Sequence, residues 1–365
     1  MNNLFFIICI ILLIFLFFSK NNKIEKFKKI KKTDKMNFSD FDLLNNKIIK
    51  IENVSYNSFV YKLEYIKNNK KYFSILKSNI GSSEEDNLFY EYQVGLFINK
   101  QIKKFPCFIK TYNIFVYKDK KSWDNFKNNL ELANDNVKMS LMNIKDKNIK
   151  NIKCNNYYGL LIQYVNNSYS LKEMLNNIDF INNELMNVLF QIYFPLISLI
   201  DKFSHNDLNY NNILIVKVVN NDFINFNYVL NDEETIIIKT QYIVKIIDYG
   251  NTYFYENEKL NTNIIYKMLN SKDNCLNDSE KYNKNIYYKK HIIENYLIND
   301  TILNYNSNFN DNNEVINYLK TINEINIKLI FEKILKYFKE KEKNLNINDK
   351  TKNIFVFQNG KNMKI

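Results

Sequence analysis

Polar residues able to bind a divalent cation occur in two segments of this sequence. The segment HNDLNYNN places His205, Asp207 and Asn212 directly after a long apolar run, although the chain has only two histidines. Asp248 ends a β-branched run in VKIIDYG, and Gly250 follows it in an expected turn. Carboxylate and amide oxygens are the ligands that hard divalent cations prefer, so these two loops would form a metal site if they lie together.

Two charged residues stand in apolar settings in the first half of the chain. Lys77 shares one face of an expected strand with Phe73 and Ile75. Glu91 lies on the less polar face of an expected helix. A buried charge is costly unless it is paired, so Lys77 and Glu91 are candidate partners for each other. The alternative is that either side chain extends to solvent, as lysine often does.

The elements that would position these residues can be read from the hydrophobic pattern. β-branched and aromatic runs bounded by polar turns predict strands, and a serine followed by acidic residues predicts a helix start. The first half has expected strands in 48–66, 70–78, 108–117 and 158–165, a turn at 67–70, a helix from about 84, and a polar, Asn- and Lys-rich insertion at 118–156.

The second half has mainly helical periodicity. Residues 185–203 predict a long buried helix with a possible kink at Pro195, and residues 313–340 predict an amphipathic helix. Between them, residues 226–247 predict strands with a hairpin turn near Asn231 and Asp232. A strand-rich part followed by a helical part indicates an α+β chain with two segregated lobes.

The N-terminus is unusually apolar. Residues 4–18 form an unbroken hydrophobic run, and a lysine-rich segment follows it. As a helix this run would be about 22 Å long, shorter than a hydrocarbon core of about 30 Å. A secretory signal is the alternative, but its basic start and small-residue cleavage site are not visible. We expect an uncleaved single-pass membrane anchor, with the rest of the chain cytoplasmic because the positive charge follows the anchor.

Composition limits the classes of partner. The formal charge of +12 would favour nucleic acid, but the lysines are scattered and the chain has no arginine. Bidentate arginine contacts to guanine are therefore impossible, and we expect no specific nucleic-acid binding. Cys9, Cys107, Cys154 and Cys275 have no zinc-type spacing, so they are expected to be ordinary thiols in a reducing compartment.

The order of these residues resembles the catalytic set of protein kinases. A strand lysine, a helical glutamate, HxDxxxxN and DxG occur in that order over residues 45–255. The segments YEYQVGLFINKQIKKFPCF, HNDLNYNNIL and YIVKIIDYG are similar to serine/threonine protein kinases encoded by large nucleocytoplasmic DNA viruses. The resemblance implies a bilobal fold, with a β-rich N-lobe that has one key helix and a mainly helical C-lobe. The implied parts are an anchor at 1–19, a basic tether at 20–44, the N-lobe at 45–165 with its insertion at about 118–156, the C-lobe at 166–345 and a tail at 346–365.

The resemblance also implies a role for each matching residue. Lys77 would hold the α- and β-phosphates of ATP and be oriented by Glu91, and Asp207 would accept the proton of a protein hydroxyl group. Asn212 and Asp248 would hold Mg²⁺. His205 would brace the loop, and Tyr249 would replace the usual Phe and pack against the helix of Glu91. The residues implied to contact the nucleotide, besides Lys77, are Asn53, Ser55, Ser58, Val60, Ile162, Gln163 and Val165.

The sequence departs from the kinase pattern at several positions. The segment NVSYNSFV stands where a glycine-rich loop is expected and contains no glycine, which puts close phosphate contact in doubt. Asn206 and Asn209 replace the Arg and Lys common in the catalytic loop, and no APE sequence follows Gly250. The 36-residue interval from Asn212 to Asp248 implies an extra strand pair at 219–240.

Two other functions remain compatible with the sequence. HNDL followed by NIL also resembles choline, ethanolamine and aminoglycoside kinases, although the short interval between Val165 and His205 is unlike those families. A catalytically inactive scaffold with a kinase fold is the other alternative. The chain retains all five polar residues of the kinase pattern, which are Lys77, Glu91, Asp207, Asn212 and Asp248. This argues against loss of activity, because an inactive site has no physical need for them.

Overall fold

The structure is a computed structural model that describes part of the chain, all of it within the compact unit Asp42–Ile365. The predicted N-terminal anchor and tether, and also Asn53 and Ser55, lie outside the described residues. Among the residues that are described, no helix is long and apolar enough to cross a membrane. The described residues are 46–50, 58–67, 69–81, 88–128, 141–143, 157–218, 223–254, 297–305, 313–323, 326–341 and 352–357.

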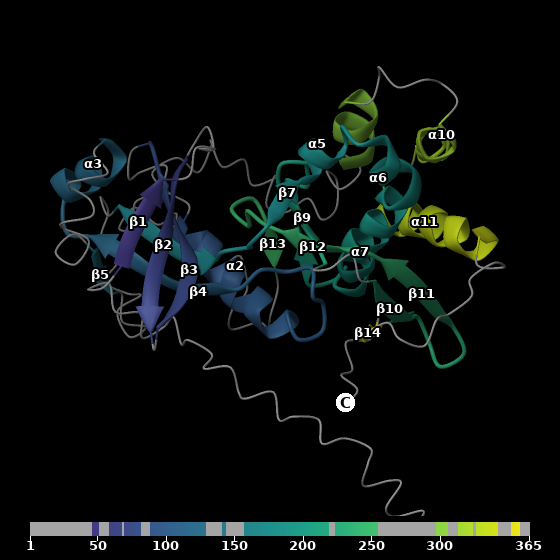
Figure 1. The fold of residues 1–365 in the computed structure, drawn as a ribbon, viewed down its shortest axis with the longest axis horizontal. Helices are drawn as coiled ribbons and strands as arrows, with labels where there is room; N and C mark the ends of the chain where they lie inside the picture. The colour runs from purple at the N-terminus through teal and green to yellow at the C-terminus, as the bar shows by residue number, and fades with distance from the viewer. Residues whose placement is uncertain are drawn as a thin grey trace, which may run out of the picture. The chain divides into compact units, whose positions relative to one another are not determined.

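Strands and helices form a mixed α+β structure, as the sequence predicted (Figure 1). The strands are β1 (Asn46–Lys50), β2 (Ser58–Lys67), β3 (Lys70–Asn79), β4 (Thr111–Tyr117), β5 (Leu141–Asn143), β6 (Tyr158–Gln163), β7 (Ser168–Ser170), β8 (Phe203–Ser204), β9 (Ile213–Lys217), β10 (Ile224–Val229), β11 (Thr235–Thr240), β12 (Tyr242–Ile246), β13 (Tyr253–Phe254) and β14 (Lys352–Phe357). The helices are α2 (Leu88–Gln101), α3 (Lys120–Asn128), α5 (Leu171–Met174), α6 (Ile178–Asn183), α7 (Leu185–Ser198), the π-helix η7 (Leu297–Leu303), α10 (Glu314–Lys320) and α11 (Ile327–Lys341).

The largest sheet has the strand order β1-β2-β3-β6-β4-β5, and its pairs are antiparallel. Side chains alternate between the two faces of a strand, so the register decides which residues share a face. Val60 on β2 and Leu160 on β6 both lie opposite Lys77 on β3. One sheet face therefore carries Lys77 together with the partly exposed Val60.

Helix α2 covers the face of the sheet that carries Lys77. Its residues Leu88, Phe89 and Tyr92 form a buried cluster with Ile114, Tyr158 and Leu160 of the sheet. The helix approaches β4 closely at Gly95, where a Cβ atom would lie 2.1 Å from Thr111 Oγ1. Gly95 is required here because no other residue leaves room for Thr111, and it lies one helical turn after Glu91.

Helix α3 covers the opposite face of the same sheet and comes from the segment expected to be an insertion. The Trp123 ring contacts Phe59, and Phe126 contacts Tyr61 and Tyr117. The Trp123 indole also donates a hydrogen bond to the carbonyl of Asn79, at the end of β3. The insertion therefore contributes packed structure, since α3 buries apolar side chains of β2 and supports the end of the strand that carries Lys77.

The remaining core is built around α7, which lies near the smaller sheets in Figure 1. Phe190 and Phe194 on this helix contact Tyr228 of β10 and Phe331 of α11. β10 and β11 form the extra strand pair predicted at 219–240, and the hairpin turn includes a hydrogen bond from Leu230 N to Glu234 O of 2.9 Å. β14 pairs in parallel with β10 and was not predicted from the sequence.

Two helix predictions were wrong in extent. The helix predicted at 185–203 ends at Ser198, because the chain turns there and residues 203–204 become β8, paired with β13. The single helix predicted at 313–340 is two helices, α10 and α11. Hydrogen bonds from Thr321 N to Tyr318 O and from Ile322 N to Leu319 O tighten the end of α10, and the Asn326 side chain accepts from Lys328 N at the start of α11.

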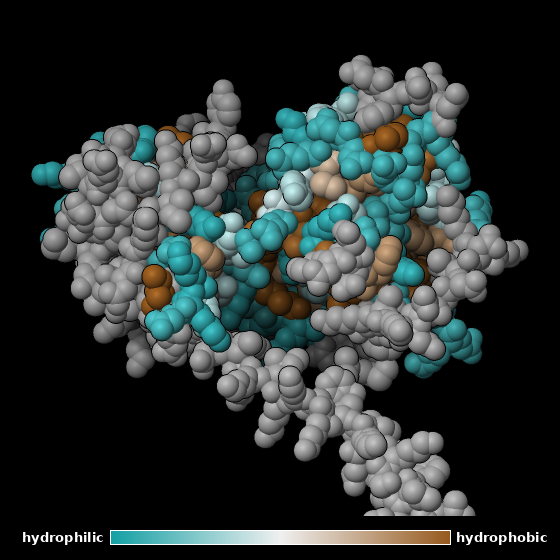
Figure 2. All heavy atoms as spheres, viewed as in Figure 1, coloured by the Kyte–Doolittle hydropathy of each residue, from teal (hydrophilic) through white to brown (hydrophobic). Residues whose placement is uncertain are grey.

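Large apolar side chains are mostly interior. On the face shown in Figure 2, hydrophilic residues cover much of the described surface and hydrophobic residues lie in small groups between them. Among the described residues, the exposed large apolar side chains are well separated in the sequence and are Ile66, Tyr169, Ile178, Phe223 and Leu329. Single exposed apolar residues of this kind are normal on a protein surface.

Replacing Gly95 should test how closely α2 must approach the sheet. Gly95→Ala removes a poor helix former, but its methyl group would overlap Thr111, so we expect a net loss of about 1–3 kcal/mol in unfolding free energy by urea denaturation. Gln93→Ala on the same helix is the control and should change stability by less than about 0.5 kcal/mol. A second substitution, Thr111→Gly, should make the Gly95→Ala effect smaller; equal or greater stability of Gly95→Ala would contradict the close approach.

Candidate active site

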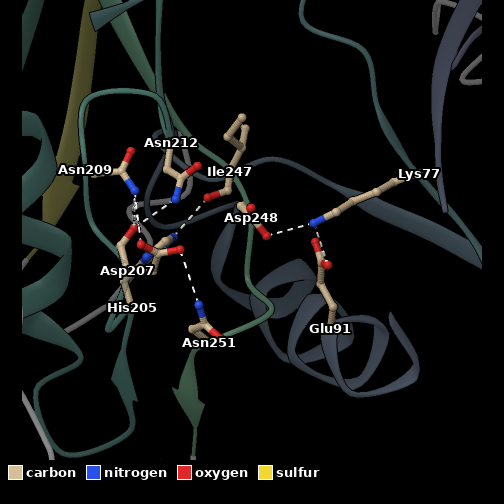
Figure 3. Close-up of polar contacts among 9 residues, drawn as sticks. All are labelled: Lys77, Glu91, His205, Asp207, Asn209, Asn212, Ile247, Asp248 and Asn251. Carbon is tan, nitrogen blue, oxygen red and sulfur yellow. Dashed lines mark hydrogen bonds and ion pairs between the residues drawn. The ribbon is translucent and has the colours of Figure 1, made fainter. Parts of the chain in front are cut away.

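Lys77, Glu91 and Asp248 meet in one ionic cluster (Figure 3). Lys77 Nζ lies 2.8 Å from Glu91 Oε2 and 2.7 Å from Asp248 Oδ1. The exposed fractions of the side chains are 14% for Lys77, 3% for Glu91 and 35% for Asp248. The pairing of Lys77 with Glu91 expected from the sequence is therefore present, and Asp248 is a second partner of the same ammonium group.

Each member of this cluster is positioned by a different element. Lys77 extends from β3, Glu91 projects from the first turn of the described part of α2, and Asp248 follows β12 by two residues. Asp248 has a φ of 66°, in the left-handed region, which aspartate and asparagine enter more readily than most residues. The backbone turn at Asp248 points its carboxylate away from the strand direction and toward β3.

The electrostatics of the cluster follow from burial and pairing. Burial alone lowers the pKa of the Lys77 ammonium, but attraction to Asp248 and Glu91 outweighs it and raises this pKa. Burial raises the pKa of Glu91, and attraction to Lys77 opposes that shift. Attraction to Lys77 lowers the pKa of Asp248 below its usual value. Of the two carboxylates, Asp248 is therefore harder to protonate than usual and Glu91 is easier to protonate than usual.

Backbone hydrogen bonds join the loop of His205 to the chain before Asp248. His205 is fully buried, and its Nε2 lies 3.0 Å from the carbonyl oxygen of Ile247. The backbone N–H of Ile247 donates to the carbonyl of Asn212 at 3.0 Å. The Asn212 side chain in turn donates to the carbonyl of Asp207 at 2.9 Å. The two loops predicted from the sequence to lie together do lie together, and His205 braces them.

The Asp207 carboxylate accepts hydrogen bonds from two neutral side-chain amides (Figure 3). Asn209 Nδ2 donates to Oδ1 at 3.0 Å, and Asn251 Nδ2 donates to Oδ2 at 3.3 Å. The side chain of Asp207 is partly exposed. A carboxylate has about four acceptor positions, so two such bonds orient it and still leave positions for another donor.

Tyr249 links the loop after β12 to the rest of the core. Its hydroxyl donates to the carbonyl of Ile246 at 2.9 Å and accepts from the backbone N–H of Ile109 at 3.2 Å. Its ring contacts those of Phe203 and His205. The backbone N–H of Tyr249 donates to Glu91, so Tyr249 contacts α2 through its backbone, whereas the resemblance implied packing against this helix.

The residues expected to face a nucleotide lie in different environments. Val60 and Ile162 are partly exposed and lie on the sheet face of Lys77, in adjacent rows of the register. Ser58 is 1% exposed. Gln163 uses its side-chain oxygen to accept from the backbone N–H of Lys110 at 3.0 Å, and the carbonyl of Val165 accepts from Ser168. Val60 and Ile162 are thus the better placed of these residues for contact with a ligand beside Lys77.

A cation and two aromatic rings fix the chain just after β6. The Lys62 ammonium lies 4.1 Å from the centroid of Phe73 and 4.1 Å from that of Tyr164. Each contact of this kind contributes on the order of 0.5–1 kcal/mol at an exposed site. Tyr164 is the first residue after β6, so this contact with Lys62 of β2 also fixes that residue to the sheet.

Searches for related proteins do not place this chain in a family. No protein-family model matches the sequence, and no curated protein matches it either. The site must therefore be interpreted from its own geometry.

Asp248 and Asn212 carry oxygen atoms of the kind that a hard divalent cation binds. One carboxylate oxygen of Asp248 binds Lys77, and the carboxylate also accepts a hydrogen bond from the backbone N–H of Gly250, so a cation would use the acceptor positions that these bonds leave. The Asn212 amide nitrogen is bound to Asp207, so its oxygen is the remaining ligand atom. Within the stretches that the structure describes, no three His, Cys, Asp or Glu side chains form a metal cluster. Asp248 and Asn212 could thus supply two oxygen ligands, and the others would come from water or a substrate.

Asn251 was not predicted from the sequence as a site residue. No motif marks it, because it is one of many asparagines and lies three residues after Asp248 without any regular spacing to Asp207. The Lys62 contact was missed for a similar reason, since Lys62 and Tyr164 are far apart in sequence. Long-range strand pairing brings these residues to their partners: β13 pairs with β8 near Asn251, and β3 pairs with both β2 and β6 near Lys62 and Tyr164.

The lowered pKa of Asp248 predicts a pH-dependent contribution to stability. A carboxylate with a lowered pKa stabilises the fold above its unfolded pKa and loses this effect as the pH falls through its folded pKa. Asp248→Asn keeps a residue that tolerates positive φ, and should cost about 1–2 kcal/mol at pH 7, allowing for solvent screening of the 35% exposed side chain.

Urea denaturation at pH 7, 5, 4 and 3 would measure this contribution. The difference between the wild type and Asp248→Asn should shrink below about pH 4. Asp232→Asn, at an exposed hairpin position, is the matched control and should leave stability unchanged at every pH. A difference that stays constant down to pH 3 would show that the carboxylate charge does not stabilise the fold.

Proposed function

We propose that this chain is an ATP- and Mg²⁺-dependent phosphotransferase, and that it is a divergent protein kinase acting on a hydroxyl group of a protein, most simply Ser or Thr. Under this proposal its α+β structure is a bilobal protein kinase-like fold. The observation that carries the proposal is the meeting of Lys77, Glu91 and Asp248, which come from β3, α2 and the end of β12. The adjacent loop brings Asp207 and Asn212 to the same place.

A lysine held between two carboxylates is suited to binding phosphate. Lys77 is charged at neutral pH and its ammonium has three donors, of which Glu91 and Asp248 each accept one. The third donor is available to a phosphate oxygen of ATP. Glu91 is almost fully buried, so it fixes the direction of the Lys77 side chain while the ammonium faces the partly exposed side of the cluster.

Phosphoryl transfer requires a group that accepts the hydroxyl proton. In the proposed reaction the substrate oxygen attacks the γ-phosphorus of ATP, the bond between that phosphorus and the β,γ-bridging oxygen breaks, and ADP leaves. Asp207 is the proposed acceptor of the proton, because its carboxylate is partly exposed and oriented by neutral donors.

Asn212 and Asp248 are the proposed Mg²⁺ ligands. When bound, Mg²⁺ would neutralise charge that develops on the phosphate oxygens. The lowered pKa of Asp248 keeps its carboxylate ionised at neutral pH, as a metal ligand must be. The hydrogen bond from the Asn212 amide to the Asp207 carbonyl turns the amide oxygen to the other side, where it can bind a cation.

The nucleotide base is proposed to lie against the apolar residues beside Lys77. Val60, Ile75 and Ile162 are partly exposed. Val60 lies opposite Lys77 in the sheet, and Ile75 lies opposite Ile162 two residues along β3. Membrane attachment through residues 4–18 and a cytoplasmic location remain part of the proposal. Those residues lie outside the described part of the chain.

The role of Asp207 can be tested by phosphate transfer. We expect Asp207→Asn to lower kcat by roughly 10²–10⁴-fold with little change in KM for ATP, because only the proton acceptor is lost. The assay would use the full-length chain in mild detergent, labelled ATP, Mg²⁺ and a mixture of proteins. Asp232→Asn is the control and should retain wild-type turnover.

The outcome also separates the proposed function from its alternatives. Transfer to choline, ethanolamine or an aminoglycoside, but not to proteins, would favour a small-molecule kinase. Equal turnover in the wild type and Asp207→Asn would remove Asp207 from the mechanism. Absence of transfer to every acceptor, together with absence of nucleotide binding, would favour an inactive scaffold.

Binding of Mg²⁺ and ATP can be measured apart from turnover. A ligand that binds only the folded state at 100 times its Kd should add about 2.7 kcal/mol of stability, which raises Tm by several degrees. We expect Asp248→Asn to lose the difference between ATP with Mg²⁺ and ATP with EDTA, and Asp207→Asn to keep it. No thermal shift in the wild type with saturating Mg²⁺ and ATP would contradict nucleotide binding.

A further inference from the structure

Asn251 lies where the chain after β12 returns to the loop that carries Asp207. β13 pairs with β8, with Tyr253 opposite Ser204 and Phe254 opposite Phe203. β8 ends directly before His205, and β13 begins two residues after Asn251. This short ladder therefore brings the segment around Asn251 beside the segment around Asp207.

The side chains complete the connection between the two segments. Asn251 Nδ2 donates to Asp207 Oδ2 at 3.3 Å, while Asn209 Nδ2 donates to Oδ1 at 3.0 Å (Figure 3). Asn209 belongs to the same loop as Asp207 and is two residues away. Asn251 comes from the other loop, so its bond depends on how the two loops lie together.

The loop of Asn251 is itself held by α2. The hydroxyl of Tyr90 donates a hydrogen bond to the backbone carbonyl of Thr252, the residue after Asn251. Both Tyr90 and Thr252 are buried. Tyr90 is the neighbour of Glu91 in α2, so the same helical turn contacts Lys77 through Glu91 and the loop of Asn251 through Tyr90.

We propose that Asn251 is a positioning residue for Asp207. It holds the carboxylate in one orientation, and it does so only when α2 and the loop after Asp248 are in place. This inference rests on the proposed function, since it assigns to Asn251 the orientation of the proposed proton acceptor. Placement of α2 then sets both the Lys77–Glu91 pair and, through Tyr90, Thr252 and Asn251, the direction of the Asp207 carboxylate.

Kinetics of Asn251 variants would test the assignment. Asn251→Ala should lower kcat about tenfold and leave KM for ATP unchanged, because loss of one hydrogen bond misdirects the carboxylate without touching the nucleotide. Asn251→Asp, which has the same shape but no amide donor at neutral pH, should be at least as impaired. Asn251→Gln, which retains the amide, should recover part of the loss.

Two further variants give the comparison its controls. Asn211→Ala changes an exposed asparagine in the Asp207 loop and should keep wild-type kcat. Tyr90→Phe removes the bond to Thr252 and should lower kcat in the same direction, but not further when Asn251 is already Ala. Wild-type kcat in Asn251→Ala would overturn the inference while leaving the proposed function intact.

A double-mutant cycle measured by thermal stability tests the contact between Asn251 and Asp207 even if the protein shows no phosphate transfer. Tm would be measured for the wild type, Asp207→Ala, Asn251→Ala and the double variant. If the two side chains are coupled, the double variant should lose less than the sum of the single losses. Additive losses would overturn the inference, whether or not the wild type transfers phosphate. Absence of phosphate transfer in a chain with coupled losses would instead count against the proposed function alone.

Discussion

An ammonium group taken out of water must be compensated by nearby negative charge, and the arrangement of this protein depends on how Lys77 meets that requirement. Its partners Glu91 and Asp248 come from α2 and from the end of β12. Both ion pairs of Lys77 therefore form only when the sheet, the helix and the second half of the chain are assembled together. Gly95 permits this by letting α2 approach β4 closely, and α3 supports the end of β3 from the other face. The ionic cluster thus requires much of the surrounding fold.

The remaining polar groups of the site are joined by hydrogen bonds from backbone, amide and imidazole groups. His205, Ile247 and Asn212 connect the two loops through backbone carbonyl and N–H groups, and the amides of Asn209 and Asn251 bind Asp207. This follows from the composition, because the chain contains no arginine and is rich in asparagine. A hydrogen bond between neutral groups contributes about 0.5–1.5 kcal/mol, and one to a charged group such as the Asp207 carboxylate about 1.5–3 kcal/mol. The loops are therefore held together by several individually modest bonds, and the positive charge of the site is concentrated in Lys77.

The parts of the fold that local patterns determine were predictable from the sequence. β-branched and aromatic runs on either side of a polar turn identified β2 and β3, and the charges of Lys77 and Glu91 in apolar settings indicated that these two side chains pair. Long-range pairing was not predictable. Phe203 was assigned to the end of the helix predicted at 185–203, but pairing of residues 203–204 with Tyr253 and Phe254 makes them a strand. Asn251 is one asparagine among many, and only that same pairing brings it to Asp207. Asn326 is a recognisable helix cap that should have divided the segment 313–340.

The parallel pairing of β14 with β10 has a consequence for how the chain is made. These strands are roughly 130 residues apart in sequence, so β10 has only β11 as a neighbour until residues 352–357 have emerged from the ribosome. At about 5–20 residues per second this delay is on the order of ten seconds. During that time one edge of β10 exposes unpaired backbone groups next to buried aromatic residues such as Phe226 and Tyr228. In nascent chains at this stage, chaperone binding or aggregation would compete with completion of the sheet.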